Sequence, residues 1–200
     1  MILALLAIGA FLIGSIPFGY LIGIAFFRTD IRQAGSGNTG AMNALRTIGK
    51  GGAAAVLVLD AFKGFFPAYF LLHRDILPPY GVALIAACAV LGHCFSPWLG
   101  WKGGKGVATS FGAIFALSWP AGLVAIGGWA IGALSTRYSS VGSMLGSVLA
   151  AVALAYFTRN PWFAAYGIFA AAFIVYTHRE NIARLRAGEE KAIPYGRVRR

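Results

Sequence analysis

The chain has 200 residues and a formal net charge of +11, with 58% hydrophobic and 12% charged residues. Soluble domains carry about a quarter charged residues, so this composition excludes a water-soluble enzyme, a disordered chain and a DNA-binding module. Basic residues in such an apolar chain are typical of the cytoplasmic face of a membrane protein. The 2 cysteines and 3 histidines lack the spacing of a disulfide framework or a zinc site, so we expect no metal and no cofactor.

Six apolar segments along the chain predict membrane-spanning helices, which need about 20 mostly apolar residues. The first, Ile2–Phe27, has no basic residue before it and is too long for the apolar part of a signal peptide, so we interpret it as a retained span. The others are 53–72, 79–92 continuing toward Pro97, 107–134, 141–157 and 162–177. No internal repeat or soluble domain is visible, and residues 1–200 are predicted to form a single integral-membrane domain.

The segment 107–134 is ambiguous, because it crosses once as one helix or twice if Ser118-Trp119-Pro120 forms a turn. Two crossings place 14 of the 17 basic residues on one side, with only Arg74 and Arg159 opposite and Lys63 inside a span. One crossing splits the basic residues 9 against 7. The positive-inside rule therefore favours an all-α bundle of seven transmembrane helices, with the N-terminus outside and the C-terminus in the cytoplasm. A re-entrant hairpin over 107–134 preserves the same parity and stays an alternative.

The first predicted cytoplasmic loop, residues 35–46, has the composition of an anion site. Its three glycines let the backbone turn tightly and point N–H groups at an anion. Ser36, Asn38 and Thr39 add hydrogen-bonding side chains, and Arg46 is able to hold a phosphate with two parallel bonds. A flexible interhelical loop is the alternative, and the lysine spacing of a P-loop is absent.

The second loop ends in Gly103-Gly104-Lys105-Gly106, which runs directly into an apolar helix. Free N–H donors, the positive end of a helix dipole and an ammonium then meet at one point. We therefore predict that Gly103, Gly104 and Lys105 bind phosphate. Trp98 and Trp101 are interpreted as anchors at the membrane interface.

Two further polar segments fall on the same side. Ser139 and Ser140 are typical of helix N-caps, whereas Ser143, just inside the next span, is predicted to face the polar cavity. His178 and Asn181 share one face if the last helix continues past Thr177, although a lone histidine is more often structural.

Asp60 and Lys63 lie three residues apart within a predicted span. Ionisable groups in a bilayer usually face the protein interior and neutralise each other, so we interpret them as a structural ion pair. The alternative is that Lys63 reaches toward the polar site.

These segments together predict one cavity for anions at the cytoplasmic face, suited to two phosphate groups. Nucleic acid is a poor partner because no soluble basic surface is available to bind it. A substrate with its phosphate in water and an acyl chain in lipid explains both the polar loops and the apolar spans.

The sequence resembles the acyl-phosphate-dependent glycerol-3-phosphate acyltransferases of bacterial membranes along nearly its whole length. Each matching motif is weak alone, but their order is specific. The motifs are Gly35-Ser36-Gly37-Asn38 with Asn43 and Arg46, Leu59-Asp60 with Lys63-Gly64, Gly92-His93, Gly103-Gly104-Lys105-Gly106-Val107-Ala108-Thr109, and His178-Arg179-Glu180-Asn181-Ile182.

The resemblance implies transfer of a fatty acyl group from acyl phosphate to the 1-hydroxyl of sn-glycerol 3-phosphate at the cytoplasmic face of a bacterial inner membrane. The products are 1-acylglycerol 3-phosphate and inorganic phosphate, the first step of phospholipid synthesis. Thioester-dependent acyltransferases carry an aspartate five positions after a histidine. His93 is followed at that distance by Trp98 and His178 by Ala183, so that motif is absent.

We then expect Ser36, Arg46 and Lys105 to hold phosphate. N–H groups near Gly104 and Ser143, with Asn181 and, as a further candidate, His178, hold the acyl phosphate and stabilise the charge of the transition state. Either His178 or the substrate's own phosphate accepts the proton of the hydroxyl, and Glu180 is interpreted as a structural partner for an arginine. A transporter or flippase for an organic phosphate is the competing function, although no inverted repeat supports it. The acyl-chain preference and the oligomeric state are left open.

Overall fold

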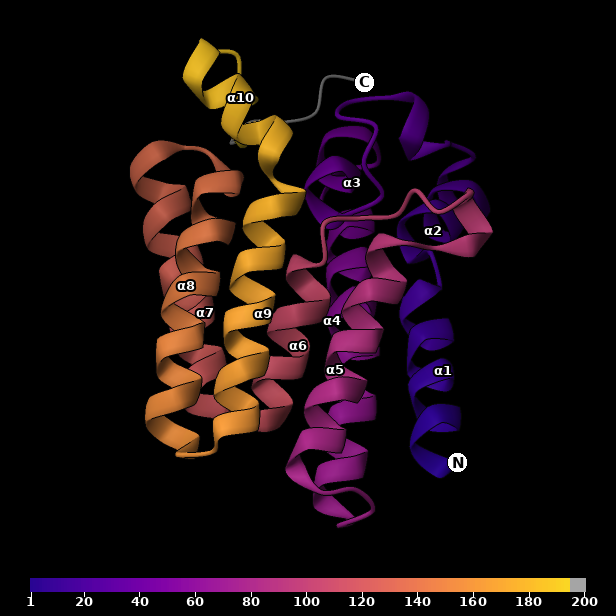
Figure 1. Ribbon diagram of the computed structural model, residues 1–200. Helices are drawn as coiled ribbons and strands as arrows, with labels where there is room; N and C mark the ends of the chain where they lie inside the picture. The colour runs from indigo at the N-terminus through magenta and orange to yellow at the C-terminus, as the bar shows by residue number, and fades with distance from the viewer. Residues whose placement is uncertain (195–200) are drawn as a thin grey trace.

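The computed structural model describes residues 1–194, and every regular element in that range is helical. Helices α1, α4, α5, α6, α7, α8 and α9 run roughly side by side along one axis, with the short elements gathered at one end (Figure 1). The prediction of an all-α bundle is therefore confirmed. The elements are α1 Ile2–Ser15, α2 Phe18–Phe27, η1 Ile31–Gln33, α3 Ala41–Thr47, α4 Gly49–His73, α5 Pro79–Cys94, η2 Pro97–Leu99, α6 Val107–Leu117, α7 Trp119–Thr136, α8 Ser139–Thr158, α9 Pro161–Thr177 and α10 Arg179–Ala187.

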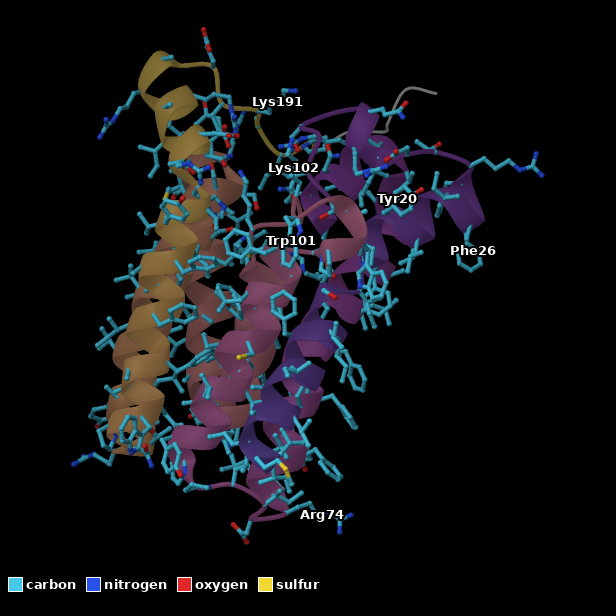
Figure 2. The ribbon with its side chains drawn as sticks, turned by 45° about the vertical axis from the view of Figure 1, so that its right-hand side comes forward. Tyr20, Phe26, Arg74, Trp101, Lys102 and Lys191 are labelled. Carbon is cyan, nitrogen blue, oxygen red and sulfur yellow. The ribbon has the colours of Figure 1, made fainter. Side chains whose placement is uncertain are left out.

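The first apolar segment, Ile2–Phe27, is a candidate span as predicted, but it consists of two helices, α1 and α2, rather than one. Pro17 disfavours helical geometry in the residue before it, and Ile16 accordingly has a ψ of 118°. The chain changes direction there, and α2 carries Tyr20 and Phe26 out to one side of the bundle (Figure 2). The break also leaves the Ile16 carbonyl available to a partner outside the helix.

The segment 107–134 does turn at its centre, as the charge distribution predicts. Ser118 is extended, with φ −162° and ψ 106°, and its side chain accepts a hydrogen bond from the Ala121 N–H at the start of α7. Helix α6 runs away from the end that carries α3 and α10, and α7 returns to it (Figure 1).

Four helical segments within residues 1–194 are long and apolar enough to cross a membrane. They are Ile2–Phe27, Gly49–His73, Pro79–Leu99 and Ser139–Thr158. Two shorter apolar helices, Val107–Leu117 and Pro161–Thr177, accompany them. The number of seven crossings stays a prediction.

Glycines set the close approach of the helices that frame the polar end. Gly64 of α4 lies against the backbone of Thr109, and Gly112 of α6 lies against the backbone of Ala61. A Cβ at either glycine would overlap a carbonyl, so α4 and α6 stay close only because these positions lack side chains. Small residues at such contacts are typical of helix packing in lipid.

The basic residues are distributed unequally between the two ends. Arg74 lies at one end, whereas Lys102 and Lys191 lie at the other (Figure 2). The α8–α9 connection, which carries Arg159, lies at the same end as the α4–α5 connection, which carries Arg74 (Figure 1). Three arginines counted in the predicted charge asymmetry, Arg197, Arg199 and Arg200, lie outside the described residues.

Candidate active site

A cavity of about 1400 Å³ opens at the end of the bundle that carries α3 and α10. Four segments that are far apart in sequence contribute its polar wall: the first loop, the glycine-lysine loop, the start of α8 and α10 with the chain that follows. The predicted site residues that line it are Ser36, Asn38, Arg46, Gly103, Lys105, Ser143, His178 and Asn181. The predicted convergence of these residues is therefore present in the structure.

The same cavity continues along apolar side chains between helices. Leu57 and Phe62 of α4, Phe111 and Phe115 of α6, and Trp129 of α7 line this part. Leu57 and Phe62 are also about half exposed. One continuous space therefore joins a cationic, hydrogen-bonding end to an apolar end, which suits an amphiphilic molecule.

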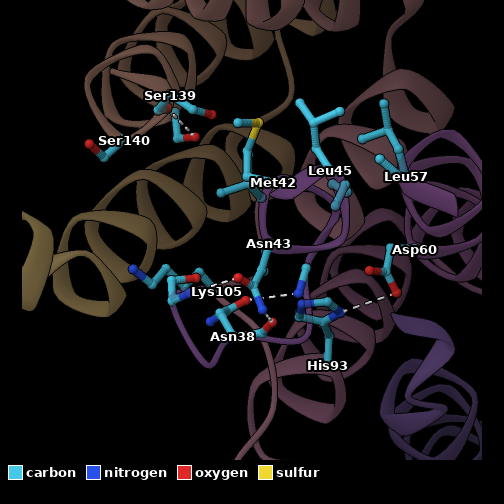
Figure 3. A pocket seen from close by; sticks show the side chains of 18 of the residues that line it. Asn38, Met42, Asn43, Leu45, Leu57, Asp60, His93, Lys105, Ser139 and Ser140 are labelled. Atoms are coloured by element: carbon cyan, nitrogen blue, oxygen red, sulfur yellow. Dashed lines mark hydrogen bonds and ion pairs between the residues drawn. The ribbon is translucent and has the colours of Figure 1, made fainter. Parts of the chain in front are cut away.

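Asn43 organises the first loop, a role that the composition of the loop did not predict. Its side-chain oxygen accepts from the Ser36 N–H at 2.7 Å, and its Nδ2 donates to the carbonyls of Ile31, Ala34 and Asn38. The side chain is 1% exposed, and Figure 3 shows it next to Asn38. Because one buried amide satisfies four backbone groups, the loop has a defined shape.

That shape decides which groups of the loop are available to a ligand. The Ser36 N–H is already bonded to Asn43, so Ser36 offers its hydroxyl. The Asn38 side-chain oxygen accepts from the Gly40 N–H at 2.9 Å, which leaves the Asn38 amide hydrogens as donors. Arg46 donates to the carbonyl of Lys191 at 3.0 Å, and its guanidinium lines the cavity.

The glycine-lysine loop differs from the prediction in one respect. The N–H groups of Gly103 and Gly104 donate to the carbonyls of Cys94 and His93, at 2.9 and 3.0 Å, so they are not free anion donors. Gly104 is buried beneath the cavity, where a Cβ would overlap the His93 ring. The N–H groups at the start of α6, which have no intrahelical acceptor, lie next along the chain, and Val107 and Ala108 line the cavity.

Lys105 is the cation that this loop presents to the cavity, and its Nζ donates to the side-chain oxygen of Asn181. Burial, and secondarily the positive charge of the nearby Arg184, lower the pKa of Lys105 to about 8. The ammonium is therefore mostly charged at neutral pH, although it is held in a site that disfavours the charge.

His178 lies at the junction of α9 and α10 and is 4% exposed. Its Nδ1 is 2.8 Å from the Ile174 carbonyl, which only accepts, so Nδ1 carries the proton and Nε2 carries the lone pair. Burial and the charge of Lys105 lower the pKa of His178 to about 4. The imidazole is neutral at physiological pH and is a weak base.

The start of α8 contributes hydroxyl groups to the cavity, but the predicted capping role of Ser139 and Ser140 is wrong. The N-cap is Tyr138, and no side chain caps the helix. The Ser140 hydroxyl instead donates to Glu190, and the Ser143 hydroxyl donates to the Ser139 carbonyl at 2.8 Å. Ser143 is 5% exposed and lines the cavity, as predicted.

The carboxylate that pairs with an arginine is Glu190, which corrects the interpretation of Glu180. Glu180 is exposed and forms no ion pair within residues 1–194. Glu190 lies 2.8 Å from Arg184 Nε. Burial by itself raises the pKa of Glu190, but hydrogen bonds from Asn181, Ser140 and Arg184 hold that pKa below its usual value. Nothing in the local sequence distinguishes Glu190 from its neighbour Glu189.

A second polar cluster lies inside the helix bundle. Lys63 Nζ is 2.8 Å from Asp60 Oδ1, which confirms the predicted pair, and it donates to the Ile16 carbonyl at 3.0 Å. Lys63 therefore does not extend into the polar site but binds the carbonyl that the break before Pro17 leaves open. His93 Nδ1 lies 3.6 Å from Asp60 Oδ1, and Figure 3 shows this pair at the edge of the cavity.

Comparison with known proteins places this arrangement in a family. A family model described as glycerol-3-phosphate acyltransferase matches residues 4–188. A glycerol-3-phosphate acyltransferase of Synechococcus sp. (strain JA-3-3Ab) is 43% identical over 189 residues, which cover 94% of this chain and 92% of the relative. One from Erythrobacter litoralis (strain HTCC2594) is 47% identical over 180 residues, covering 90% and 89%.

Two crystal structures have the same fold. Both are of PlsY (YgiH), an integral membrane glycerol 3-phosphate acyltransferase. The glycerol 3-phosphate form matches with a TM-score of 0.90 and 36% identity, covering 96% of each chain. The lysophosphatidic acid form matches with a TM-score of 0.89 and 35% identity, covering 96% of this chain and 95% of that one.

Proposed function

The chain belongs to the glycerol-3-phosphate acyltransferase family, and from that premise we propose that it transfers a fatty acyl group from acyl phosphate to the 1-hydroxyl of sn-glycerol 3-phosphate. The products are 1-acylglycerol 3-phosphate and inorganic phosphate. The single observation that carries the proposal is the cavity, because its cationic end and its apolar end match the two ends of the acyl donor and of the product. The absence of a histidine with an aspartate five positions later further favours acyl phosphate over a thioester donor.

The phosphate of glycerol 3-phosphate is assigned to the side of the cavity formed by the first loop. The Arg46 guanidinium, the Ser36 hydroxyl and the Asn38 amide point donors at this region, and Lys105 lies between it and α10. Charge-assisted hydrogen bonds of this kind are stronger than neutral ones and fix the position of the neighbouring hydroxyl.

The acyl phosphate is assigned to the opposite side, with its acyl chain between α4, α6 and α7. The N–H groups at the start of α6, the Ser143 hydroxyl and Asn181 are placed to hold its phosphate and to stabilise charge on the carbonyl oxygen. Lys105 contacts Asn181 and is shared by the two phosphate sites. The Gly103 and Gly104 N–H groups take no part, because they are bonded to carbonyls.

In the reaction, the 1-hydroxyl oxygen attacks the acyl carbon and the bond from that carbon to the phosphate oxygen breaks. The departing phosphate keeps the electron pair, and Lys105 neutralises the charge that develops on it. Since the pKa of His178 is only about 4, we assign the proton of the hydroxyl to a substrate phosphate. Before the attack, His178 Nε2 accepts a hydrogen bond from this hydroxyl and orients it, and the single proton turns to the phosphate as the oxygen attacks.

We place the enzyme in a bacterial inner membrane, crossing it seven times with the cavity facing the cytoplasm. The crowding of basic residues at the end that carries the cavity supports this orientation.

The test uses the purified protein in detergent or in vesicles, with acyl phosphate and glycerol 3-phosphate as the added compounds. Release of inorganic phosphate that requires both compounds, with formation of 1-acylglycerol 3-phosphate, is the expected result. Release that is independent of glycerol 3-phosphate, or none above the rate without protein, would exclude the proposed reaction. Uptake of glycerol 3-phosphate into vesicles without acylation would indicate transport instead.

A further inference from the structure

Glu190 follows α10 and enters the polar site, although neither its position in the sequence nor the reaction calls for a carboxylate there. We infer that Glu190 is a positioning residue, which orients the Asn181 amide toward Lys105 and offsets the cations that surround this lysine. The inference rests on the proposed function only in taking Lys105 as the group that must carry a positive charge.

Three donors hold the Glu190 carboxylate. Oε1 accepts from Asn181 Nδ2 at 2.5 Å and from the Ser140 hydroxyl at 2.8 Å, and Oε2 accepts from Arg184 Nε at 2.8 Å. The side chain is 6% exposed. A carboxylate with this many short contacts to α8 and α10 is a fixed part of the wall of the cavity.

The contact between Glu190 and Asn181 determines which atom of the Asn181 amide faces Lys105. An asparagine side chain has a donor side and an acceptor side that are nearly equal in shape. An ionised carboxylate only accepts, so Glu190 takes the Nδ2 side of Asn181. The Oδ1 side is thereby left for the Lys105 ammonium, which donates to it. Without the carboxylate, the amide is free to turn its Nδ2 toward the ammonium and repel it.

The charge of Glu190 acts on Lys105 as well. The cations Arg184 and Arg46 favour the neutral form of this lysine, while Glu190 and the exposed Glu180 favour the charged form. His178, on the junction of α9 and α10, is neutral. Glu190 is the buried member of the two acids, so its field is least screened by solvent.

The chain around Glu190 is anchored on both sides. Gly188 adopts a left-handed conformation with φ +72°, which turns the chain back after α10 and lets the Glu189 N–H bond the Arg184 carbonyl at 2.8 Å. Beyond Glu190, Lys191 Nζ donates to the Gly35 carbonyl at 2.6 Å, and the Ile193 N–H donates to the Arg137 carbonyl at 2.9 Å. The position of the carboxylate is therefore fixed by contacts of the neighbouring chain with the end of α10 and with two separate loops.

The experiment compares phosphate release as a function of pH in wild type, Glu190→Gln and Glu189→Gln, with both substrates saturating and the rate without protein subtracted. Glutamine keeps the shape and removes the charge, and Glu189 is the exposed neighbour. In wild type, the rate falls as pH rises through about 8, where Lys105 loses its proton. In Glu190→Gln, we expect at least about a tenfold lower kcat and a fall that begins about one pH unit lower. Glu189→Gln should follow wild type.

Arg184→Gln gives a second measurement with the opposite sign, which keeps the inference testable if Glu190→Gln fails to fold. Removing a cation beside Lys105 should move the alkaline fall to higher pH. A purely structural Glu190 would lower the yield or the melting temperature and leave the pH profile of the folded fraction unchanged. A Glu190→Gln profile that coincides with wild type would overturn the inference, and if that variant does not fold, an Arg184→Gln profile that coincides with wild type would do so.

The two proposals fail in different ways. If wild type releases no phosphate with both substrates, the proposed reaction is wrong, whatever Glu190 does. If wild type is active and the pH profiles of Glu190→Gln and Glu189→Gln are the same, only the positioning role is wrong.

Discussion

Two lysines in this protein, Lys63, which is buried, and Lys105, which is half-buried, have opposite electrostatic surroundings. Lys63, inside the bundle, has a carboxylate at 2.8 Å and a backbone carbonyl at 3.0 Å, and its side chain is 3% exposed. Lys105, at the polar end, is bonded to the neutral amide of Asn181 and has Arg184 and Arg46 nearby. The charge of Lys63 is therefore neutralised within the protein, whereas the charge around Lys105 is left in surplus.

The difference separates a structural cation from a functional one. A charge that is neutralised by the protein holds helices together, as Lys63 does for α4 and the broken end of α1. A surplus of positive charge facing a cavity is costly to keep and attracts an anion from outside. Whether a lysine inside the protein is structural or functional therefore depends on the charged and polar groups that already surround it. The following variants test this distinction.

The largest expected effect is on stability, from Asp60→Ala. The substitution leaves Lys63 buried without its counter-ion, which should lower the free energy of unfolding by about 3–5 kcal/mol. Thermal unfolding in detergent measures it. The control Asp60→Asn/Lys63→Met removes both charges together and should recover most of the loss. If Asp60→Ala were as stable as wild type, the pair would not be the structural one that we describe.

Lys105→Ala tests the functional cation. Removal of the charge should cost about 3 kcal/mol of transition-state stabilisation, roughly a hundredfold in kcat/KM, with little change in melting temperature. Phosphate release measures the first and thermal unfolding the second. Lys50→Ala removes the same charge from the exposed start of α4 and is the matched control. Near-normal turnover of Lys105→Ala would remove this lysine from the site.

Asn43→Ala tests whether the ordered conformation of the first loop is needed to bind glycerol 3-phosphate in the cationic part of the cavity. It removes the side chain that satisfies four backbone groups, so we expect about a tenfold higher KM for glycerol 3-phosphate, equivalent to about 1.4 kcal/mol. Asn160→Ala removes the N-cap of α9 at the opposite end and should affect stability without raising KM. Equal KM values for the two variants would mean that the loop does not position the substrate.

The smallest effect is expected for His178→Asn. With a pKa of about 4, the imidazole is a weak base, and asparagine still offers a hydrogen-bond acceptor. We expect kcat to fall by less than about tenfold. A fall of a hundredfold or more, with unchanged melting temperature, would instead identify His178 as the general base. Loss of this neutral side chain should therefore lower the rate less than loss of the charge of Lys105.

The sequence determined the features of this protein that depend on local composition and spacing. Apolar segments and their charged flanks predicted an all-α membrane bundle and the turn at Ser118, because the length and burial of each helix follow from its own residues. The pairing of Asp60 with Lys63 was predictable as well, since residues three positions apart share one face of a helix. The phosphate-binding composition of the loops was visible in the same way.

Tertiary structure decided how those groups are used. Asn43 orders the first loop, the carbonyls of His93 and Cys94 occupy the N–H groups of Gly103 and Gly104, and Glu190 rather than Glu180 pairs with Arg184. Each of these contacts is between groups that come together only because of how the helices cross and where the chain reverses direction. The sequence gives the type of each side chain. Which of its donors, acceptors and charges stay available to a ligand depends on neighbours that only packing brings together.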